Sequence, residues 1–491
     1  MGIIVLRHRV ASCVRTAATV LGLLLTIHGC GGGGTDVPPP EVPPSPPRVQ
    51  DSRIFSTPVE TALPALAGSP VETDRWVGTL DGAAYRIEVP KQWNGILVMW
   101  ARGYWSAQDL FIEDPLIRRH LIAKGYAWAA SSFTRNFYDV NAGIEDTNKL
   151  ALRFQQLAAS HGRSLAAPRR LFIAGMSMGG HIAASAVETE VVRDARNPVR
   201  YDGALSMCGS LSGAGWYEYM AAYQLAMQQL LGFPAESYPS VVYAQNLTSL
   251  RNLLPNAQGL GATEQPGVMK LYALMEQLSG GARPFYREGW QDPYHHSILF
   301  TLMNGKPTMD GILALNGLDT SLVQYRFGGP TTVDDETRQF NAQVRRLVAD
   351  ADPNPPQPKG LRWVPLTAGQ LMAPVMTLQT LGDLTVPITE QIRYRARVDA
   401  QGGSQRLAQR LVRDVGHCSF TNAEVTAAFD DLVAWVEQGL RPGGDDLLDS
   451  RAWTAPSAGC AYTDNRTSAD DRADATRRAK VQSAYPACPQ R

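Results

Sequence analysis

The segment "FIAGMSMGGH", residues 172–181, places one serine between two glycines. Mostly apolar residues lead into Gly175, Ser177 follows two positions later, and Gly179 two positions after that. The pattern Gly-x-Ser-x-Gly between a strand and a helix is typical of a sharp turn that holds a serine hydroxyl out at the edge of a sheet. Glycine fits there because strand and helix crowd together and leave no room for a Cβ atom. We therefore predict a strand-to-helix turn at Ser177, with an inert serine in a tight turn as the alternative to a reactive one.

Strands and helices alternate along the chain on both sides of this turn. Short apolar runs predict the strands, and segments with helical spacing predict the helices. Such alternation requires a mostly parallel sheet with helices on both faces, which is an α/β fold, and only the first two strands are expected to pair antiparallel. The expected strands cover residues 76–82, 83–90, 95–101, 126–133, 170–175, 201–209, 374–383 and 406–415, and the expected helices cover 116–125, 144–162, 179–192, 389–403 and 424–440.

The alternation stops in the middle of the chain. Residues 211–370 are rich in Tyr, Met, Leu and Gln and contain helical stretches such as "WYEYMAAYQLAMQQLLGF". A structureless loop of that length would be improbable in a compact domain, so we predict a large, mainly helical cap insertion. The predicted core then consists of residues 71–210 and 371–440, and residues 441–491 are expected to form a polar C-terminal extension over the surface.

The N-terminus has the charge order of an export signal. Arginines precede the apolar run "TAATVLGLLLTI", which is too short to span a bilayer comfortably. The signal, residues 1–29, leads into Cys30 through "TIHGC", which is similar to the lipobox of bacterial lipoproteins, so Cys30 is the expected lipidated residue. His28 departs from the small residue usual there, and signal cleavage without lipidation is the alternative. Residues 30–70, rich in glycine and proline, are expected to form a solvated linker. We thus expect an exported protein, either a cell-envelope lipoprotein or a secreted one.

The overall charge excludes some partners. Lys plus Arg and Asp plus Glu each number 46 among the 491 residues, so the formal net charge is zero. Such a balance provides no field for nucleic acid or an anionic membrane surface, and we expect a membrane contact only through a lipid at Cys30. No cysteine pair has the C-x-x-C spacing of a zinc site, and neither a metal nor a cofactor is expected.

A reactive serine needs a base, and the base needs an acid that orients it. On a parallel sheet with this kind of turn, the acid and then the histidine follow the serine along the chain. "TLGDLTVP" places Asp383 just past one predicted strand, and "RDVGHCSF" places His417 in the loop after the last strand. We predict that Ser177 attacks a carbonyl carbon, that His417 takes and returns its proton, and that Asp383 fixes the imidazole tautomer.

Other residues compete for these roles. Asp414 is the alternative acid, although it is expected inside the strand that precedes His417. His181 lies one turn into the following helix, where it can support the turn but is badly placed as a base. His295 and His296 in "DPYHHS" are rival histidines with a metal or lid role as an option, but we interpret them as surface loop residues.

The attack would also create an oxyanion, which needs two N–H donors. The first is expected to be the main-chain N–H of Met178, directly after the serine. The second is expected from the loop "ARGYW", hence from the main chain of Arg102, Gly103 or Tyr104.

Five segments together carry a resemblance to a known family: "WNGILVMWARGY", "GMSMGGH", "YDGALSMCG", "GDLTVP" and "GHCSF". Over residues 75–440 the chain resembles the α/β-hydrolase superfamily, and within it secreted bacterial serine hydrolases that are mostly assigned as esterases. The resemblance implies an α/β-hydrolase fold and a Ser-His-Asp triad. In that group the loop after the strand usually reads His-Gly-Tyr. Arg102 stands here in place of the histidine, which implies a larger, cationic side chain next to the site and hints at acidic or carboxylate-bearing substrates.

Four cysteines lie beyond the signal and the lipidation position, and they allow three pairings. Cys208 ends the strand beside the turn and Cys418 follows His417, so both belong at one sheet edge. An exported protein meets an oxidising environment, so we favour Cys208–Cys418 together with Cys460–Cys488. Tannases and feruloyl esterases are similar in having a disulfide-bonded cysteine after the histidine. Two free buried cysteines are the alternative for the first pair.

Aromatic residues of the insertion are candidates for the wall of an acyl or aromatic pocket, with the core of the cap itself as the alternative. They are Trp216, Tyr217, Tyr219, Tyr223 and Phe233.

The sequence as a whole predicts an exported, metal-independent serine hydrolase that cleaves a small or oligomeric carboxylic ester. A serine aminopeptidase is the first alternative; Glu218 could read a free amine, although no second glutamate pairs with it. A non-catalytic envelope lipoprotein is the second alternative.

Overall fold

The computed structural model describes residues 53–58, 62–232, 266–292, 294–296, 318–328, 333–349, 354, 360–471, 478 and 488. All of these residues belong to one compact unit, Arg48–Arg491. The predicted signal, Cys30 and Phe233 lie outside the described residues. None of the helices in the described part of the chain has both the length and the apolar character needed to cross a membrane.

Eight strands form one sheet in the order β1-β2-β4-β3-β5-β6-β7-β8. β2 runs antiparallel to both β1 and β4, and every other neighbouring pair is parallel. The inner strands are buried on both faces, as a doubly covered parallel sheet requires. The expected α/β architecture is confirmed. The strands are β1 (Thr73–Leu80), β2 (Ala83–Pro90), β3 (Ile96–Ala101), β4 (Ala127–Ser131), β5 (Arg170–Met176), β6 (Gly203–Met207), β7 (Val375–Thr380) and β8 (Leu407–Val412).

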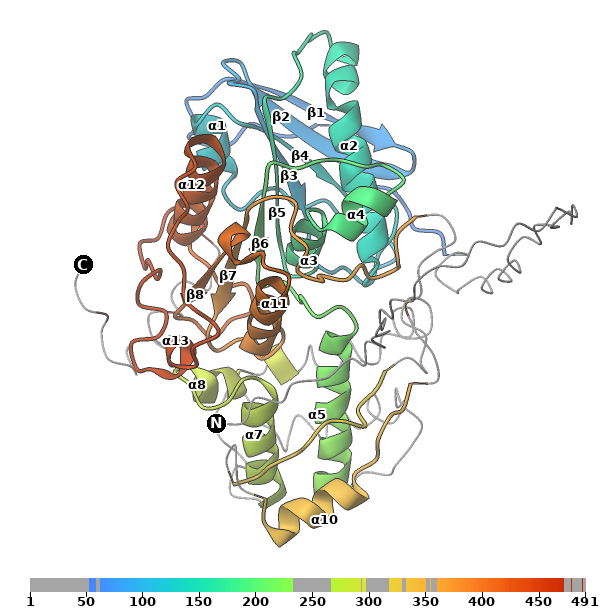
Figure 1. Ribbon diagram of the computed structural model, residues 1–491. Helices are drawn as coiled ribbons and strands as arrows, with labels where there is room; N and C mark the ends of the chain where they lie inside the picture. Colours follow the sequence, from blue (N-terminus) through green and yellow to red (C-terminus); the bar gives the residue numbers. More distant parts are fainter. Residues whose placement is uncertain are drawn as a thin grey trace, which may run out of the picture. The chain divides into compact units, whose positions relative to one another are not determined.

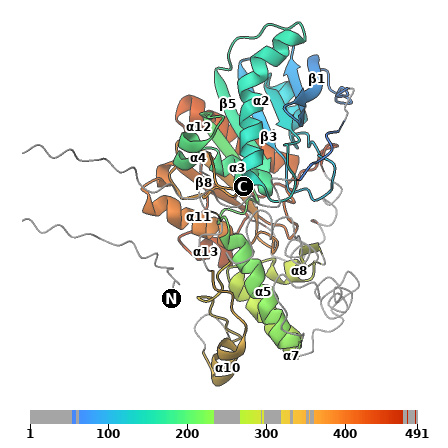
Figure 2. The same ribbon diagram turned by 90° about the vertical axis from the view of Figure 1, so that its right-hand side faces the viewer.

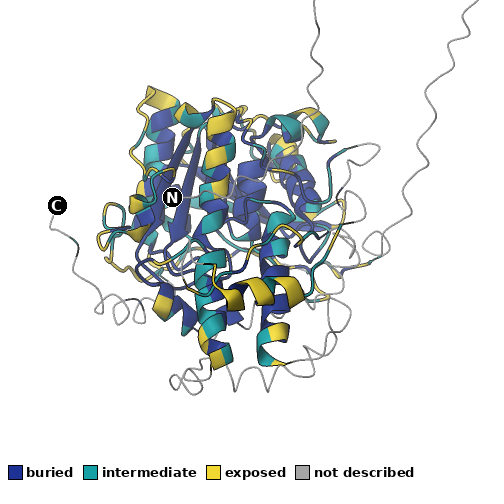
Figure 3. Ribbon diagram, turned by 60° about the horizontal axis from the view of Figure 1, so that its bottom comes forward, coloured by how far each residue is buried: buried dark blue, intermediate teal, exposed yellow. Residues whose placement is uncertain are grey.

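Helices cover both faces of the sheet (Figures 1 and 2). Successive strand residues point to opposite faces, so Met99 of β3 packs in the layer of α2 and α3, and Val98 packs in the layer of α1 and α12. Figure 3 shows the strands as buried and the outward faces of the helices as exposed. The covering helices are α1 (Arg118–Ala123), α2 (Val140–Ser160), α3 (Met178–Ser185), α4 (Thr189–Asp194), α11 (Ile388–Ala400), the short 3₁₀ helix η4 (Ser404–Arg406) and α12 (Asn422–Gln438).

The helix expected over 179–192 is two helices, α3 and α4. Between them Glu188 has an extended backbone and pairs with Leu371 in an isolated β-bridge. The carboxylate of Glu188 accepts the N–H groups of Gly369 (3.1 Å) and Gln370 (2.7 Å). This pairing interrupts the helix, and the helical spacing of the sequence carries no sign of it.

The described parts of the insertion between β6 and β7 contain helices and also segments without helix, such as residues 318–328. Figures 1 and 2 both show α5, α7 and α10 together below the sheet, beyond one of its edges rather than on one of its faces. α5 and α7 pack together through Ala222, Leu225 and Leu274. That the insertion acts as a cap stays a prediction. Its helices are α5 (Gly215–Leu231), α7 (Pro266–Leu278), α8 (Tyr286–Trp290) and α10 (Asp335–Gln343).

The described residues at the end of the predicted linker contact the core at a few positions. Phe55 and Leu63 are buried. Ser56 donates its N–H to the carbonyl oxygen of Gln108 (3.2 Å) and accepts the N–H of Leu110 (2.8 Å). Two apolar side chains of this stretch are therefore packed into the core, whereas the other described residues before 71 are partly or fully exposed.

The C-terminal extension runs along the edge strand β8 and contains α13 (Arg451–Thr454). Asp445 donates its N–H to the carbonyl oxygen of Gln409 (2.6 Å) and accepts the N–H of Leu411 (2.8 Å). Leu447 and Trp453 are buried in a small hydrophobic cluster that also contains Leu381 and Leu411 of the core. The extension thus covers an otherwise open sheet edge rather than only lying over the surface.

Candidate active site

Ser177 lies at the turn between β5 and α3. Its φ is 57° and its ψ is −122°, a conformation that residues other than glycine rarely adopt. A Cβ at Gly179 would lie 2.0 Å from the carbonyl oxygen of Ala101, and a Cβ at Gly175 2.6 Å from the same atom. The two glycines therefore allow α3 to approach the end of β3. The turn leaves Ser177 partly exposed at the carboxyl edge of the sheet.

Three segments that are distant in the sequence meet at this edge. Nε2 of His417 lies 2.9 Å from Oγ of Ser177, and Nδ1 of His417 lies 2.6 Å from Oδ2 of Asp383. An ionised carboxylate only accepts hydrogen bonds, so Nδ1 carries the hydrogen and Nε2 has its lone pair toward the serine hydroxyl. The structure thus brings the three predicted residues together in the geometry that proton transfer from the serine requires.

Asp383 is fully buried just after β7. Its second oxygen, Oδ1, accepts the N–H groups of Thr385 (2.9 Å) and Val386 (3.0 Å). Burial by itself raises the pKa of Asp383, but the charge of His417 and its hydrogen bond, the nearby His295 and the Val386 N–H outweigh burial and lower the pKa below its ordinary value. The carboxyl group therefore stays ionised in the folded protein at neutral pH.

Asp414, the alternative acid, does not face the imidazole of His417 through any contact that the structure describes. It also lies just past β8 rather than inside a strand. Its carboxylate accepts the N–H groups of Val415 (2.6 Å) and Gly416 (3.2 Å) and the hydroxyl of Ser419 (2.9 Å). Asp414 therefore shapes the loop that carries His417.

The other candidate histidines are deeply buried. Nδ1 of His181 lies 2.9 Å from the hydroxyl of Tyr138 and Nε2 lies 3.1 Å from the carbonyl oxygen of Pro365, and burial lowers the pKa of His181 to about 4. The interpretation of His295 and His296 as surface loop residues is wrong, because His295 is 0% and His296 4% exposed. His295 contacts loops of the core and His296 contacts helices of the insertion, which the local sequence does not reveal.

A disulfide joins the two strand ends at the site. Cys208, after β6, is bonded to Cys418, which follows His417, with a Cα–Cα distance of 5.4 Å. Sγ of Cys418 lies 3.5 Å from Nε2 of His417, so the bridge contacts the ring directly. The two sulfur atoms are bonded to each other and therefore do not offer thiolates to a metal. The other favoured pair, Cys460–Cys488, is also bonded.

The loop after β3 lies against the turn. A Cβ at Gly103 would lie 3.7 Å from Cβ of Ser177. The assignment of Met178, Gly103 and Tyr104 as oxyanion donors stays a prediction.

The inference from Arg102 to acidic substrates is not supported. Its side chain is fully buried and donates to the carbonyl oxygens of Ser132, Arg135 and Gly103 and to Oδ1 of Asn136. Burial lowers the pKa of Arg102 to about 9, which leaves it charged at neutral pH. Because its guanidinium donates its hydrogen bonds mainly to main-chain oxygens, Arg102 joins the loop after β3 to the loop after β4 instead of facing a substrate.

Four of the five candidate pocket aromatics lie in the main hydrophobic cluster: Trp216, Tyr217, Tyr219 and Tyr223. Rings of Trp216 and Tyr217 lie 5.0 Å apart, and each contacts Tyr138. This burial favours the alternative that they form core.

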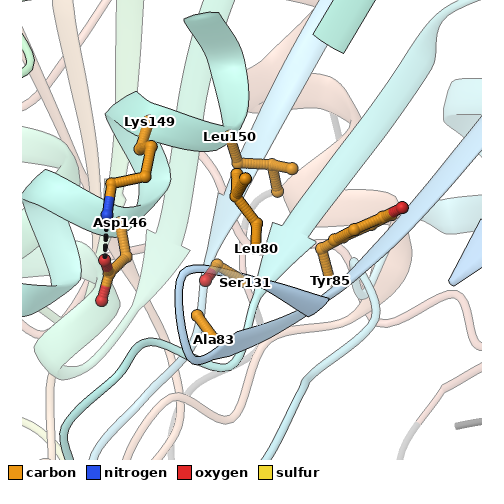
Figure 4. A pocket seen from close by; sticks show the side chains of 7 residues that line it. All are labelled: Leu80, Ala83, Tyr85, Ser131, Asp146, Lys149 and Leu150. Atoms are coloured by element: carbon orange, nitrogen blue, oxygen red, sulfur yellow. Dashed lines mark ion pairs between the residues drawn. The ribbon is translucent and has the colours of Figure 1, made fainter. Parts of the chain in front are cut away.

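A separate small pocket lies between the β1–β2 hairpin and α2 (Figure 4), and no residue of the predicted triad lines it.

Sequence reasoning missed several residues that surround the triad. Thr385 follows Asp383 by two positions, and its hydroxyl lies 2.9 Å from Nδ1 of His295. Thr380 at the end of β7 donates its hydroxyl to the carbonyl oxygen of Gly416 (2.9 Å). In the sequence, these contacts are indicated only by the closeness of the two threonines to Asp383.

Comparisons with known proteins find similarity among solved structures only. No family model and no curated protein matches the sequence. Among solved structures, feruloyl esterase B from Aspergillus oryzae is similar over 76% of this chain and 82% of its own, with a TM-score of 0.44 and 13% identity. An esterase from Pyrococcus furiosus covers 79% of this chain and 99% of its own, with a TM-score of 0.37 and 10% identity. Proline iminopeptidase from Mycobacterium smegmatis covers 74% and 98%, with a TM-score of 0.33 and 12% identity. These similar structures are two esterases and an iminopeptidase.

Proposed function

We propose that this protein is a serine hydrolase that cleaves carboxylic esters through an acyl-enzyme intermediate. The proposal is supported above all by one observation: the imidazole of His417 lies between Oγ of Ser177 (2.9 Å) and Oδ2 of Asp383 (2.6 Å). A hydroxyl, a ring and a carboxylate in this order are the groups that activate a serine as a nucleophile.

In the proposed reaction, Oγ of Ser177 attacks the ester carbonyl carbon while Nε2 of His417 takes its proton. Main-chain N–H groups of Met178 and of Gly103 or Tyr104 stabilise the oxyanion. The imidazolium then gives the proton to the departing alcohol, which leaves an acyl group on Ser177. Water attacks the acyl carbon with His417 again as the base, the acid departs and the serine is restored. Asp383 stabilises the imidazolium and keeps its proton on Nδ1.

The peptidase alternative uses the same triad and differs only in the leaving group and the pocket. Glu218, the carboxylate of the insertion that could read a free amine, accepts the N–H of Asp319 (3.4 Å), and its desolvation by burial raises its pKa. A carboxyl group that is desolvated and already bonded is a poor site for an ammonium group. We therefore favour an ester over an aminoacyl substrate.

The experiment that tests the proposal compares p-nitrophenyl esters of rising acyl length with aminoacyl p-nitroanilides. Ser177→Ala is expected to lower ester turnover by about 10⁴-fold or more. Ser206→Ala, which alters a buried serine of the neighbouring strand β6, is the matched control and is expected to keep its activity. Turnover of anilides alone would make the protein a peptidase, and equal ester rates in Ser177→Ala would refute the triad. Absence of both turnover and fluorophosphonate labelling in the wild type would favour the non-catalytic alternative.

We also propose that the protein is exported and carries a lipid at Cys30. The signal-like residues 1–29 and the "TIHGC" sequence support this, and both disulfides suit an oxidising compartment. Metabolic labelling with an alkyne fatty acid is expected to mark the wild type in the membrane fraction and not Cys30→Ser. An unlabelled wild-type protein in the soluble exported fraction would favour secretion after ordinary cleavage.

A further inference from the structure

His295 is a buried histidine of the insertion that lies against the proposed triad. It follows α8, and none of its surface is exposed. Nδ1 lies 2.9 Å from Oγ1 of Thr385, and Nε2 lies 2.7 Å from the carbonyl oxygen of Val415. Thr385 follows Asp383 by two residues, and Val415 precedes His417 by two. One imidazole ring thus bridges the two loops that carry the proposed acid and the proposed base.

The hydrogen positions of this bridge follow from its partners. A carbonyl oxygen only accepts, so Nε2 of His295 carries the hydrogen and donates to Val415. In the neutral ring, Nδ1 then has a lone pair, which accepts the hydroxyl hydrogen of Thr385. The main-chain N–H of the same Thr385 donates to Oδ1 of Asp383, and Nδ1 of His295 lies 3.6 Å from that oxygen. The imidazole ring of His295 therefore holds Thr385 in place, and Thr385 in turn holds the carboxylate of Asp383.

We infer that His295 is a positioning residue: it holds the Asp383 loop and the His417 loop at the separation that the proton transfer needs. The inference rests on the proposed function. His295 has no described contact with Ser177; it acts through Thr385 and Val415, and it lies close enough to Asp383 to help lower the pKa of that carboxyl group. Because it belongs to the insertion, it also makes the geometry of the triad depend on the packing of α8.

The neighbouring His296 provides a matched control. It is 4% exposed, and Nε2 lies 2.7 Å from the carbonyl oxygen of Trp290, while Nδ1 lies 3.5 Å from the hydroxyl of Tyr223. Both partners lie in the insertion. His295 and His296 thus share their burial and their segment, and they differ in whether their partners lie beside the triad.

The experiment compares His295→Leu with His296→Leu by steady-state ester hydrolysis and thermal unfolding. A displacement of about 1 Å in catalytic groups can cost 10²-fold, so His295→Leu is expected to lower kcat by about 10- to 100-fold with KM changed less than twofold. His296→Leu is expected to lower the unfolding temperature to a similar extent with kcat within about threefold. Equal kcat losses at equal loss of stability would overturn the inference.

Two conservative variants keep the test decisive if His295→Leu does not fold. His295→Gln retains a donor near Nε2 for Val415, and His295→Asn retains an acceptor near Nδ1 for Thr385. Each is expected to restore part of kcat. Thr385→Val is expected to lower kcat in the wild type and in His295→Asn but not in His295→Gln, whose longer side chain does not place its amide oxygen at the position of Nδ1. Equal effects of Thr385→Val in all three backgrounds would contradict the bridge.

Fluorophosphonate labelling separates this inference from the proposed function. A wild type that labels at Ser177, together with His295→Leu and His296→Leu labelling at the same rate, would refute the positioning role and leave the function intact. A wild type that neither labels nor hydrolyses esters would refute the function, and the positioning role would fall with it.

Discussion

At the scale of single residues, two buried carboxylates near His417, those of Asp383 and Asp414, have different roles. Asp383 accepts the hydrogen bond from Nδ1 of His417. Asp414 instead accepts hydrogen bonds from the N–H groups of Val415 and Gly416, in the loop just before His417. A carboxylate that contacts the imidazole stabilises its charged form directly. A carboxylate that caps a loop affects catalysis only through the position of that loop.

Asparagine substitutions are expected to separate these two roles. Asp383→Asn keeps the shape of the side chain but presents an N–H₂ group to Nδ1, which favours the wrong tautomer and is expected to lower kcat by about 10³–10⁴. Asp414→Asn is expected to lower kcat by less than about tenfold and to lower the unfolding temperature instead. Ester hydrolysis and thermal unfolding of both variants measure this, and a larger kcat loss in Asp414→Asn would reverse the assignment.

Some residues of the site can be predicted from the sequence, and others cannot. Ser177, Asp383 and His417 each follow a strand of a parallel sheet, so local patterns and chain order place them at one edge. Nothing local distinguishes His295 from a loop histidine, because its partners Thr385 and Val415 lie in loops far along the chain. Arg102 could be placed beside the turn, but the direction of its side chain depends on carbonyl groups of another loop.

At the scale of secondary-structure elements, the sheet edge is strained at three residues of one site. Ser177, Cys208 and Cys418 all have positive φ, at 57°, 45° and 57°. Such conformations cost free energy and persist only where the surroundings enforce them. Cys208 and Cys418 are joined to each other, so the disulfide ties the end of β6 to the loop of His417.

Removal of this disulfide is expected to affect both stability and catalysis. The bridge spans 210 residues of sequence, so the Cys208→Ala/Cys418→Ala variant is expected to lose about 3–5 kcal/mol of unfolding free energy and to lower kcat. The Cys460→Ala/Cys488→Ala variant, whose bridge spans 28 residues, is the control with an expected smaller loss of stability and of kcat. Denaturant unfolding and ester hydrolysis test this. An unchanged kcat in the first variant would mean that packing alone positions the loop.

Local sequence patterns predict the strands but not every boundary between elements. The strands were predictable because buried parallel strands are short apolar runs between turn residues. The break between α3 and α4 was not, because Glu188 leaves the helix to pair with a segment far along the chain. The same limit applies to residues 53–70, whose composition suggests a linker although Phe55 and Leu63 are buried.

At the scale of the whole molecule, the insertion and the C-terminal extension both reach the loop of His417. His295 of the insertion binds Val415. Arg478 of the extension lies buried behind the same loop, where its guanidinium donates to both carboxylate oxygens of Glu424 and lies 3.5 Å from Oδ2 of Asp414. Two segments outside the predicted core thus support the loop that carries the proposed base.

The role of Arg478 predicts a pH-dependent loss of stability in Arg478→Gln. Burial is the largest influence on Asp414 and Glu424 and raises the pKa of each, whereas the charge of Arg478 lowers both pKa values. Without the arginine both pKa values rise further above those of the unfolded chain. An acid with a raised pKa in the folded state stabilises the fold while it is protonated, and stability is lost as pH rises from the unfolded pKa through the folded pKa.

Arg478→Gln is therefore expected to lose more unfolding free energy at pH 7.5, about 3–5 kcal/mol, than at pH 4.5, where the two carboxyl groups can hold protons. Arg466→Gln, which removes an exposed arginine of the same extension paired with Asp464, is the control with an expected loss much smaller than that of Arg478→Gln at either pH. Urea unfolding at the two pH values measures both variants. A loss in Arg478→Gln that is equal at both pH values would mean that Arg478 contributes packing rather than charge, and the support of the His417 loop would then not depend on this ion pair.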